Sequence, residues 1–253
     1  MPAPHFKQHN GELKMTAVPY KPSRSTPMEK GGPCEISLDA ETIPSQLPQI
    51  RDMLLKDITP AKNLKDPAKI EADIAAKQES VMDKAGLNGL TCHIISLAVA
   101  IDDHEPVSFS TDSWENERKI IVEFFDYITK NCGNYAHTFI GHCVVGFDLK
   151  VLRQRCMVLG IKWPVIFDSA FKDKWGEVTF DTMLKWNGGD KHDFVSLDKL
   201  CMAFGVDTPK TDMTGADVYN YWRQGRIDEI AEYNKRDVIA VRSVKKAMTF
   251  DNI

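Results

Sequence analysis

The stretch CEISLDAETIP, from Cys34 to Pro44, joins an apolar run typical of a buried strand to two carboxylates, Asp39 and Glu41. Side chains alternate along a strand, so the two acids face the same side of a sheet. Two like charges buried side by side are strongly unfavourable unless a positive group lies between them, and a divalent cation commonly supplies that charge. The stretch therefore predicts a metal site whose further ligands come later in the chain.

The composition is typical of a globular protein with an ordinary core. Of the 253 residues, 43% are hydrophobic and 27% are charged, which is enough to bury a sizeable core in one main domain. The net charge of −4 provides no general attraction for nucleic acid. A polyanionic partner would therefore bind through a local basic patch or through bound metal.

Cysteine usage and hydropathy indicate the compartment. The six cysteines are scattered, without a C-x-x-C pair or zinc-like spacing, which predicts reduced thiols. No apolar run approaches the ~18 residues of a membrane span, and the N-terminus lacks the apolar core of a signal peptide. We therefore expect a cytoplasmic protein with no membrane partner.

The expected organisation is a tail followed by one domain. Residues 1–33 are rich in proline and poor in large apolar side chains, which predicts a flexible N-terminal tail. This tail is either only solvated or makes a weak contact with nucleic acid or another partner. Residues 34–250 are expected to form the main domain, in which residues 45–90 are a helical insertion between the first two strands.

Hydrophobic spacing predicts the elements of this domain. The expected strands are residues 34–44, 91–101, 105–110 and 136–141. The expected helices are residues 67–84 after the N-cap Asp66, and residues 114–130, 147–159, 197–204, 216–223 and 227–248, with Ser196 and Gly205 bounding the fourth. Residues 161–193 are expected to be rich in loops. Together these elements predict an α/β or α+β domain with helices covering a mixed sheet.

Two further acids stand where a cleft could form. Asp148, in GHCVVGFDLKVL, lies where an apolar strand gives way to a helix, and Asp237 follows Tyr233 by four residues on the last predicted helix. Residues at this spacing share one helix face. Four carboxylates converging on one cleft would hold two Mg²⁺ or Mn²⁺ ions, an arrangement used for phosphodiester hydrolysis.

The order of these motifs resembles that of a nuclease family. D-A-E in an apolar strand, G-F-D before a helix and Y-x-x-x-D near the C-terminus resemble the three motifs of the DEDDy 3′→5′ exonucleases of the ribonuclease H-like superfamily. The stretches LDAETIP, GFDLKVLRQR, FDTM and GRIDEIAEYNKRDV are similar to those of predicted phage and bacterial exonucleases related to the proofreading domain of family B DNA polymerases. The resemblance covers about residues 34–248 and implies a ribonuclease H-like mixed sheet flanked by helices.

The resemblance also implies roles for individual residues. The metal-binding acids would be Asp39, Glu41, Asp148 and Asp237. Tyr233 would orient the attacking water, because a phenol with a reference pKa near ~10 is poorly suited to act as a full base. The sister DEDDh group has a His where this chain has Glu232, which indicates the Tyr type.

Candidate substrate contacts surround the second motif. They are His142, Cys143, Phe147, Arg153 and Asp181. Many relatives have an Asn at the position of Cys143, where it shapes the substrate site, so the resemblance implies an effect of Cys143 on substrate preference or rate. Alternatively, His142 and Asp181 are hydrogen-bonded structural groups and Cys143 is a small buried thiol.

Basic and aromatic residues have two interpretations each. Lys150, Arg153 and Arg155 would either bind phosphates or remain solvated on the outer face of their helix. Three tryptophans in the loop-rich region would either stack a terminal base or pack in the core or a lid: Trp163, Trp175 and Trp186.

The resemblance implies a metal-dependent 3′→5′ exonuclease that hydrolyses single-stranded DNA by a two-metal mechanism. Expected partners are single-stranded nucleic acid, with DNA favoured, and candidate replication or recombination proteins. Two alternatives stay open: an RNA-directed exonuclease, and a nucleic-acid-binding module with weak or vestigial activity.

Overall fold

A mixed sheet of five strands lies at the centre of the computed structural model, which describes residues 33–132, 137–172, 178–190, 193–209 and 213–251. The strand order is β3-β2-β1-β4-β5. The strands are β1 (Glu35–Pro44), β2 (Cys92–Ile101), β3 (Val107–Ser110), β4 (Thr138–Gly141) and β5 (Thr179–Asp181). The predicted tail lies, except for Pro33, outside the described residues.

Strand β1 occupies the middle of this sheet. It pairs with β2 in antiparallel and with β4 in parallel orientation. Ile36, Leu38 and Ala40 belong to the main hydrophobic core, so the alternation of a strand turns Asp39 and Glu41 to the opposite face. The register with β2 shifts between Glu41 and Thr42, which marks an irregularity of the β-bulge type directly after the second acid.

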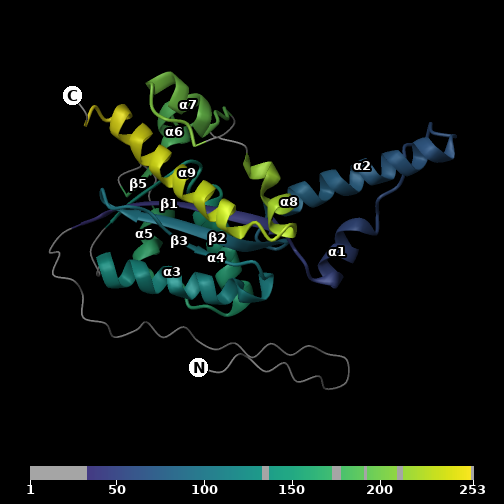
Figure 1. The fold of residues 1–253 in the computed structure, drawn as a ribbon, viewed down its shortest axis with the longest axis horizontal. Coiled ribbons are helices and arrows are strands. Elements are labelled where there is room, and N and C mark those ends of the chain that lie inside the picture. The colour runs from purple at the N-terminus through teal and green to yellow at the C-terminus, as the bar shows by residue number, and fades with distance from the viewer. Residues whose placement is uncertain (1–32, 133–136, 173–177, 191–192, 210–212, 252–253) are drawn as a thin grey trace, which may run out of the picture.

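Helices cover both faces of the sheet (Figure 1). The helices α3 (Glu117–Cys132), α4 (Asp148–Leu159) and α5 (Asp168–Lys172) lie on one side, and the long helix α9 (Ile227–Met248) crosses the other. Ala98 and Ala100 of β2 pack with Val238 of α9. Because these alanines are small, α9 can lie close to the sheet and bring its polar residues near β1.

A helical arm joins β1 to β2. It contains α1 (Pro48–Leu55) and α2 (Pro67–Ala85), and α2 projects away from the sheet (Figure 1). Asp66 caps α2 as predicted, since its Oδ1 accepts the backbone N–H of Ala68 at 3.0 Å. Within α2 only Ala85 is buried, so this helix makes a small contribution to the core.

Short helical elements complete the fold, and some of them were predicted from the sequence. They are η1 (Trp114–Asn116), η2 (Val165–Phe167), α6 (Thr182–Trp186), α7 (Leu197–Phe204), η3 (Gly215–Asp217) and α8 (Val218–Arg223). The bounds of α7 and α9 are confirmed, and Gly205 ends α7 with φ of 65°. Ser196 is the N-cap residue of α7 as predicted, but its side chain makes no capping hydrogen bond.

The prediction that residues 161–193 are rich in loops was partly wrong. This stretch holds the strand β5 and the short helices η2, α5 and α6. The strand pairs over only three residues with β4, which is too short to produce a recognisable hydrophobic alternation. No helix in the described ranges is both long and apolar enough to cross a membrane.

Arg155 corrects the interpretation of α4 as a helix with a basic outer face. It is only 3% exposed, and its guanidinium donates two hydrogen bonds of 2.7 Å to the carboxylate of Glu117 on α3. A third bond of 3.0 Å goes to the backbone oxygen of Gly89. The guanidinium is therefore committed to the interior and cannot bind a phosphate, whereas Lys150 and Arg153 are exposed.

Candidate metal centre

Asp39 and Glu41 lie on the part of β1 that extends beyond its parallel neighbour. Strand β4 pairs with β1 only as far as Ser37, whereas Asp39 and Glu41 still pair across β2 with Ala98 and Ser96. The first motif therefore borders an edge where β4 has ended. This edge is open to side chains from the segment that follows β4.

Asp148 fills that edge from the first turn of α4. Its Oδ1 accepts the backbone N–H of Ala40 at 3.1 Å, so it makes contact with β1 between the two acids of the first motif. The chain reaches this position through a tight turn after β4. A side chain on Gly141 would place Cβ 2.5 Å from Cβ of Val144, so the turn requires a glycine there.

Helix α9 supplies three neighbouring polar residues from the other face: Tyr233, Asn234 and Asp237, all buried. Tyr233 packs in a small hydrophobic cluster with Ile43 and Ile230. Asn234 donates a hydrogen bond of 3.0 Å from Nδ2 to Oδ2 of Asp39. The second and third motifs therefore meet the first from two directions.

The carboxylates are close enough to share a cation. One oxygen each from Asp39, Glu41 and Asp237 lies within 4.8 Å of the others. An all-oxygen, anionic set of ligands suits a hard divalent cation such as Mg²⁺ or Mn²⁺. Asp148 is outside this group of three, and one of its oxygens already bonds to Ala40.

The electrostatics of the cluster favour a cation. Burial raises the pKa of Asp39 well above its ordinary value, and the charges of Asp148, Asp237 and Glu41 raise it further. Burial and the neighbouring acids also raise the pKa of Glu41 and of Asp148. A divalent cation would relieve this repulsion, because it stabilises the ionised form of every carboxylate around it.

Tyr233 stays protonated in this environment. Burial raises the pKa of its phenol, and the charges of Asp237, Glu41 and Asp39 raise it further. A phenol of this kind can donate a hydrogen bond but is a poor base at neutral pH.

Two of the predicted substrate contacts make hydrogen bonds within the protein. The ring of His142 bonds through Nδ1 to Oγ1 of Thr182 at 2.9 Å and through Nε2 to the backbone oxygen of Val195 at 2.8 Å. Oδ1 of Asp181 accepts the N–H of Cys143 at 3.0 Å and of Met183 at 3.1 Å. These bonds tie the turn after β4 to β5 and α6.

The other predicted contacts lie around α4. Cys143 is half-buried with φ of 63°, Phe147 is half-buried against the main core, and Arg153 lies over the ring of Phe171. Among the tryptophans, Trp163 packs beside the core and Trp186 is exposed next to Phe204. Trp175 lies outside the described residues.

Sequence reasoning missed Asn234, although a signal was present. Asn234 lies four residues after Ile230 and four before Val238, on the apolar stripe of the last predicted helix. A polar residue at a position where helical spacing predicts burial needs a specific partner. Asp39 is that partner.

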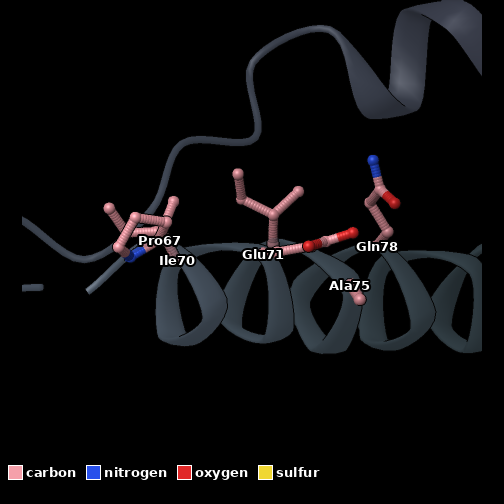
Figure 2. Close-up of a pocket in the computed structure, with 6 residues that line it drawn as sticks. Pro67, Ile70, Glu71, Ala75 and Gln78 are labelled. Carbon is pink, nitrogen blue, oxygen red and sulfur yellow. The ribbon is translucent and has the colours of Figure 1, made fainter. Parts of the chain in front are cut away.

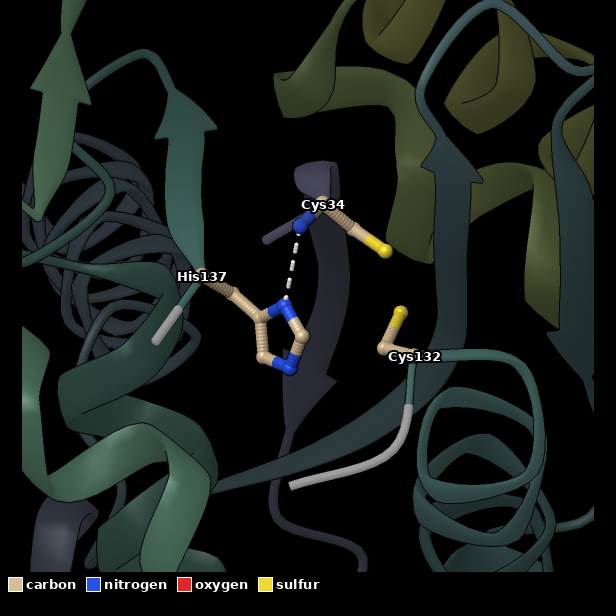
Figure 3. A group of neighbouring side chains, drawn as sticks. All are labelled: Cys34, Cys132 and His137. Carbon is tan, nitrogen blue, oxygen red and sulfur yellow. Dashed lines mark hydrogen bonds between the residues drawn. The ribbon is translucent and has the colours of Figure 1, made fainter. Parts of the chain in front are cut away.

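A second group of possible ligands lies at the other end of β1. Figure 3 shows Cys34, Cys132 and His137, whose ligand atoms are also within 4.8 Å of one another. Nδ1 of His137 accepts the backbone N–H of Cys34 at 3.1 Å, so the neutral ring carries its proton on Nε2. This tautomer leaves no lone pair for a metal, and we assign no metal to the group.

A surface groove on the arm is likewise no part of the acidic site. Figure 2 shows that it runs along α2, where it is lined by residues that include Ile70, Ile74 and Ala75. Glu71 is the only carboxylate among its lining residues in the part of the chain that the structure describes. The groove therefore lacks the ligands that a catalytic cation requires.

Residues 87–244 match the family model described as "Predicted 3'-5' exonuclease related to the exonuclease domain of PolB". The chain belongs to this family. The match covers more than half of the chain and includes Asp148, Tyr233 and Asp237, whereas Asp39 and Glu41 precede it. No curated protein matches the sequence.

The fold is similar to that of a known polymerase. The family B DNA polymerase from the hyperthermophilic archaeon Pyrobaculum calidifontis matches with a TM-score of 0.53 and 18% sequence identity, over 86% of this chain and 25% of the polymerase chain. At this identity the similarity concerns the fold alone. It confirms the predicted ribonuclease H-like architecture, a mixed sheet flanked by helices, while this chain spans about a quarter of the polymerase.

Proposed function

We propose that this protein is a metal-dependent 3′→5′ exonuclease that hydrolyses single-stranded DNA. The observation that carries the proposal is the approach of Asp39, Glu41 and Asp237 to within 4.8 Å of one another, in a chain of a predicted exonuclease family. Mutually repelling carboxylates at this distance are explained by cation binding.

The proposed ligands of two Mg²⁺ or Mn²⁺ ions are Asp39, Glu41, Asp237 and Asp148. Asp148 would contribute through the oxygen that does not bond to Ala40. When bound, such ions supply an activated water and stabilise the charge on the phosphate and the leaving oxygen. The protein itself fixes the positions of the acids on β1, α4 and α9.

Tyr233 is the proposed orienting group for the attacking water. Its raised pKa keeps the phenol protonated, so it would donate a hydrogen bond that orients the water and would not act as the base. The packing of Tyr233 against Ile43 and Ile230 holds the ring in one place. Such a fixed donor lowers the entropic part of the barrier.

DNA is the proposed substrate because the protein of similar fold is a DNA polymerase. The test is a comparison of 3′-labelled single-stranded DNA, duplex DNA and RNA, incubated with the full chain in Mn²⁺ or Mg²⁺ and with a chelator. We expect release of mononucleotides from the 3′ end of single-stranded DNA and no release with chelator. Faster hydrolysis of RNA than of single-stranded DNA would identify RNA as the substrate. Metal binding without hydrolysis of any of these substrates would indicate a nucleic-acid-binding module.

Asp237→Asn tests the site within the same assay. The substitution keeps the shape of the side chain and removes its charge, so activity should fall more than about 100-fold. Asp228→Asn is the matched control, because Asp228 lies exposed in the first turn of the same helix. Undiminished activity of Asp237→Asn would refute the proposed site.

A further inference from the structure

Asn234 has an unusual position for an amide side chain. It is 0% exposed and lies on α9 between Tyr233 and Asp237, two residues of the proposed centre. Its Nδ2 donates to Oδ2 of Asp39 at 3.0 Å. The amide therefore joins the middle of α9 to the first acid of β1.

The orientation of this amide is fixed by charge. When Asp39 is ionised, as it is beside a bound cation, an amide rotated by half a turn would place Oδ1 against a carboxylate oxygen, and two acceptors would repel each other. Only the N–H donor is compatible with the contact. The bond uses Oδ2 of Asp39, and a carboxylate has a second oxygen that can bind a cation.

The other end of the amide shows that packing alone does not explain Asn234. Its Oδ1 is buried and has no hydrogen-bond partner among the described residues. An unpaired buried acceptor destabilises a fold, and a leucine of similar volume would avoid this penalty. The hydrogen bond that accounts for an amide at this position is the one to Asp39.

We propose that Asn234 is a positioning residue that holds Asp39 by Oδ2 and turns its other oxygen toward the bound cation. The inference rests on the metal centre proposed above. Without the amide, repulsion from Glu41, Asp148 and Asp237 is free to rotate the Asp39 carboxylate out of the cluster. Loss of such an outer partner typically weakens metal binding or activity by about 10–100-fold.

The test is direct binding of Mn²⁺ to the metal-stripped full chain, measured by calorimetry. We expect Asn234→Leu and Asn234→Ala to raise the dissociation constant about 10–100-fold. The control is Asn131→Leu, the same substitution on α3, where the amide donates to the backbone oxygen of Tyr127 at 2.7 Å. That variant should change Mn²⁺ affinity by less than about threefold, because it is not part of the cluster.

Nuclease assays separate positioning from a merely structural role. In the Asn234 variants the Mn²⁺ concentration for half-maximal rate should rise, while the rate at saturating Mn²⁺ recovers to within about threefold of the original. Loss of the cooperative unfolding transition in both variants would assign a structural role and overturn the proposal. Unchanged Mn²⁺ affinity in variants that fold would also overturn it. Failure of the unaltered protein to bind Mn²⁺ would instead overturn the metal centre.

Discussion

Asp148 accepts the backbone N–H of Ala40 through Oδ1 at 3.1 Å. This bond replaces a hydrogen bond between neighbouring strands, because β4 pairs with β1 only up to Ser37. Ala40 lies between Asp39 and Glu41, so the second motif fixes the backbone that carries the first. Asp148 thereby has a structural task in addition to its proposed role as a metal ligand.

The two tasks of Asp148 can be separated by substitution. Asp148→Asn keeps an acceptor for the Ala40 N–H, whereas Asp148→Ala removes it. Because Asp148 is buried, we expect the Ala variant to be less stable than the Asn variant by about 1–3 kcal/mol. Both should lose metal-dependent activity. Urea unfolding in the presence of a chelator measures the difference, and equal stability of the two variants would show that the bond to Ala40 is unimportant.

The acidic cluster predicts a pH dependence of stability in the metal-free protein. The pKa values of Asp39, Glu41 and Asp148 are raised above 3.8, 4.5 and 3.8. Between these ordinary values and the raised ones, the folded protein binds more protons than the unfolded chain. Stability should therefore be fully present below about pH 4 and fall as pH rises, by about 1.4 kcal/mol per pH unit for each carboxyl protonated only in the folded state.

A comparison with Asp39→Asn isolates this effect. Burial lowers the pKa of His142, so the titration of this residue makes stability rise with pH in an overlapping range. Because both proteins contain His142, its contribution cancels in the comparison. The stability lost between pH 5 and pH 8 in chelator should be smaller in Asp39→Asn. Saturating Mg²⁺ should reduce the loss in the unaltered protein. Parallel stability curves for the two proteins would show that the acids are not electrostatically coupled.

The contrast between α9 and β5 explains how much of the fold could be predicted from sequence. The bounds of α9 follow from a long apolar stripe, and the order of the acidic motifs predicted carboxylates that the fold brings together. Strand β5 was missed because its three residues gain their conformation from pairing with β4. The partner of Asn234 was missed because it lies 195 residues away, a separation across which local patterns contain no information.

Arg155 is another residue whose buried environment could not be predicted from the sequence, and it gives a third prediction. Its ion pair with Glu117 is buried, with side-chain exposures of 4% and 2%. Burial opposes ionisation of Glu117, but hydrogen bonds from His93 and Arg155 lower its pKa. Arg155→Ala would remove the guanidinium that balances this buried carboxylate and leave it only His93 and the Ile94 N–H as partners, and we expect a loss of about 3–5 kcal/mol in the free energy of unfolding.

The control for Arg155 lies two residues earlier on α4. Arg153 is exposed, so Arg153→Ala should change stability by less than about 0.5–1 kcal/mol. The double variant Arg155→Met with Glu117→Met should recover part of the loss, because it removes both buried charges but leaves the Ile94 N–H and the Gly89 carbonyl without their partners. Urea unfolding at neutral pH measures all three. A loss for Arg155→Ala as small as that for Arg153→Ala would mean that His93 and the Ile94 N–H suffice to stabilise the Glu117 carboxylate.

Cys143 occupies a left-handed backbone conformation, with φ of 63°. Residues with a Cβ are disfavoured there by about 1–2 kcal/mol, whereas Asn tolerates the region better. Burial, followed by the charges of Asp181 and Asp148, raises the pKa of the thiol to about 11, so Cys143 is unreactive at neutral pH. Its hydrogen bond to Asp181 uses the backbone N–H and survives any change of side chain. We therefore expect Cys143→Asn to stabilise the protein by about 0.5–1 kcal/mol.

Cys143→Ser is the matched control for this last prediction. Serine keeps the size of the side chain but gains less than Asn from the left-handed conformation. Thermal unfolding should therefore rank Asn above both Ser and the original Cys. If Asn and Ser unfold at the same temperature, backbone strain at position 143 is not what limits stability. A rise in exonuclease rate for the Asn variant alone would then locate the effect of residue 143 in the substrate site.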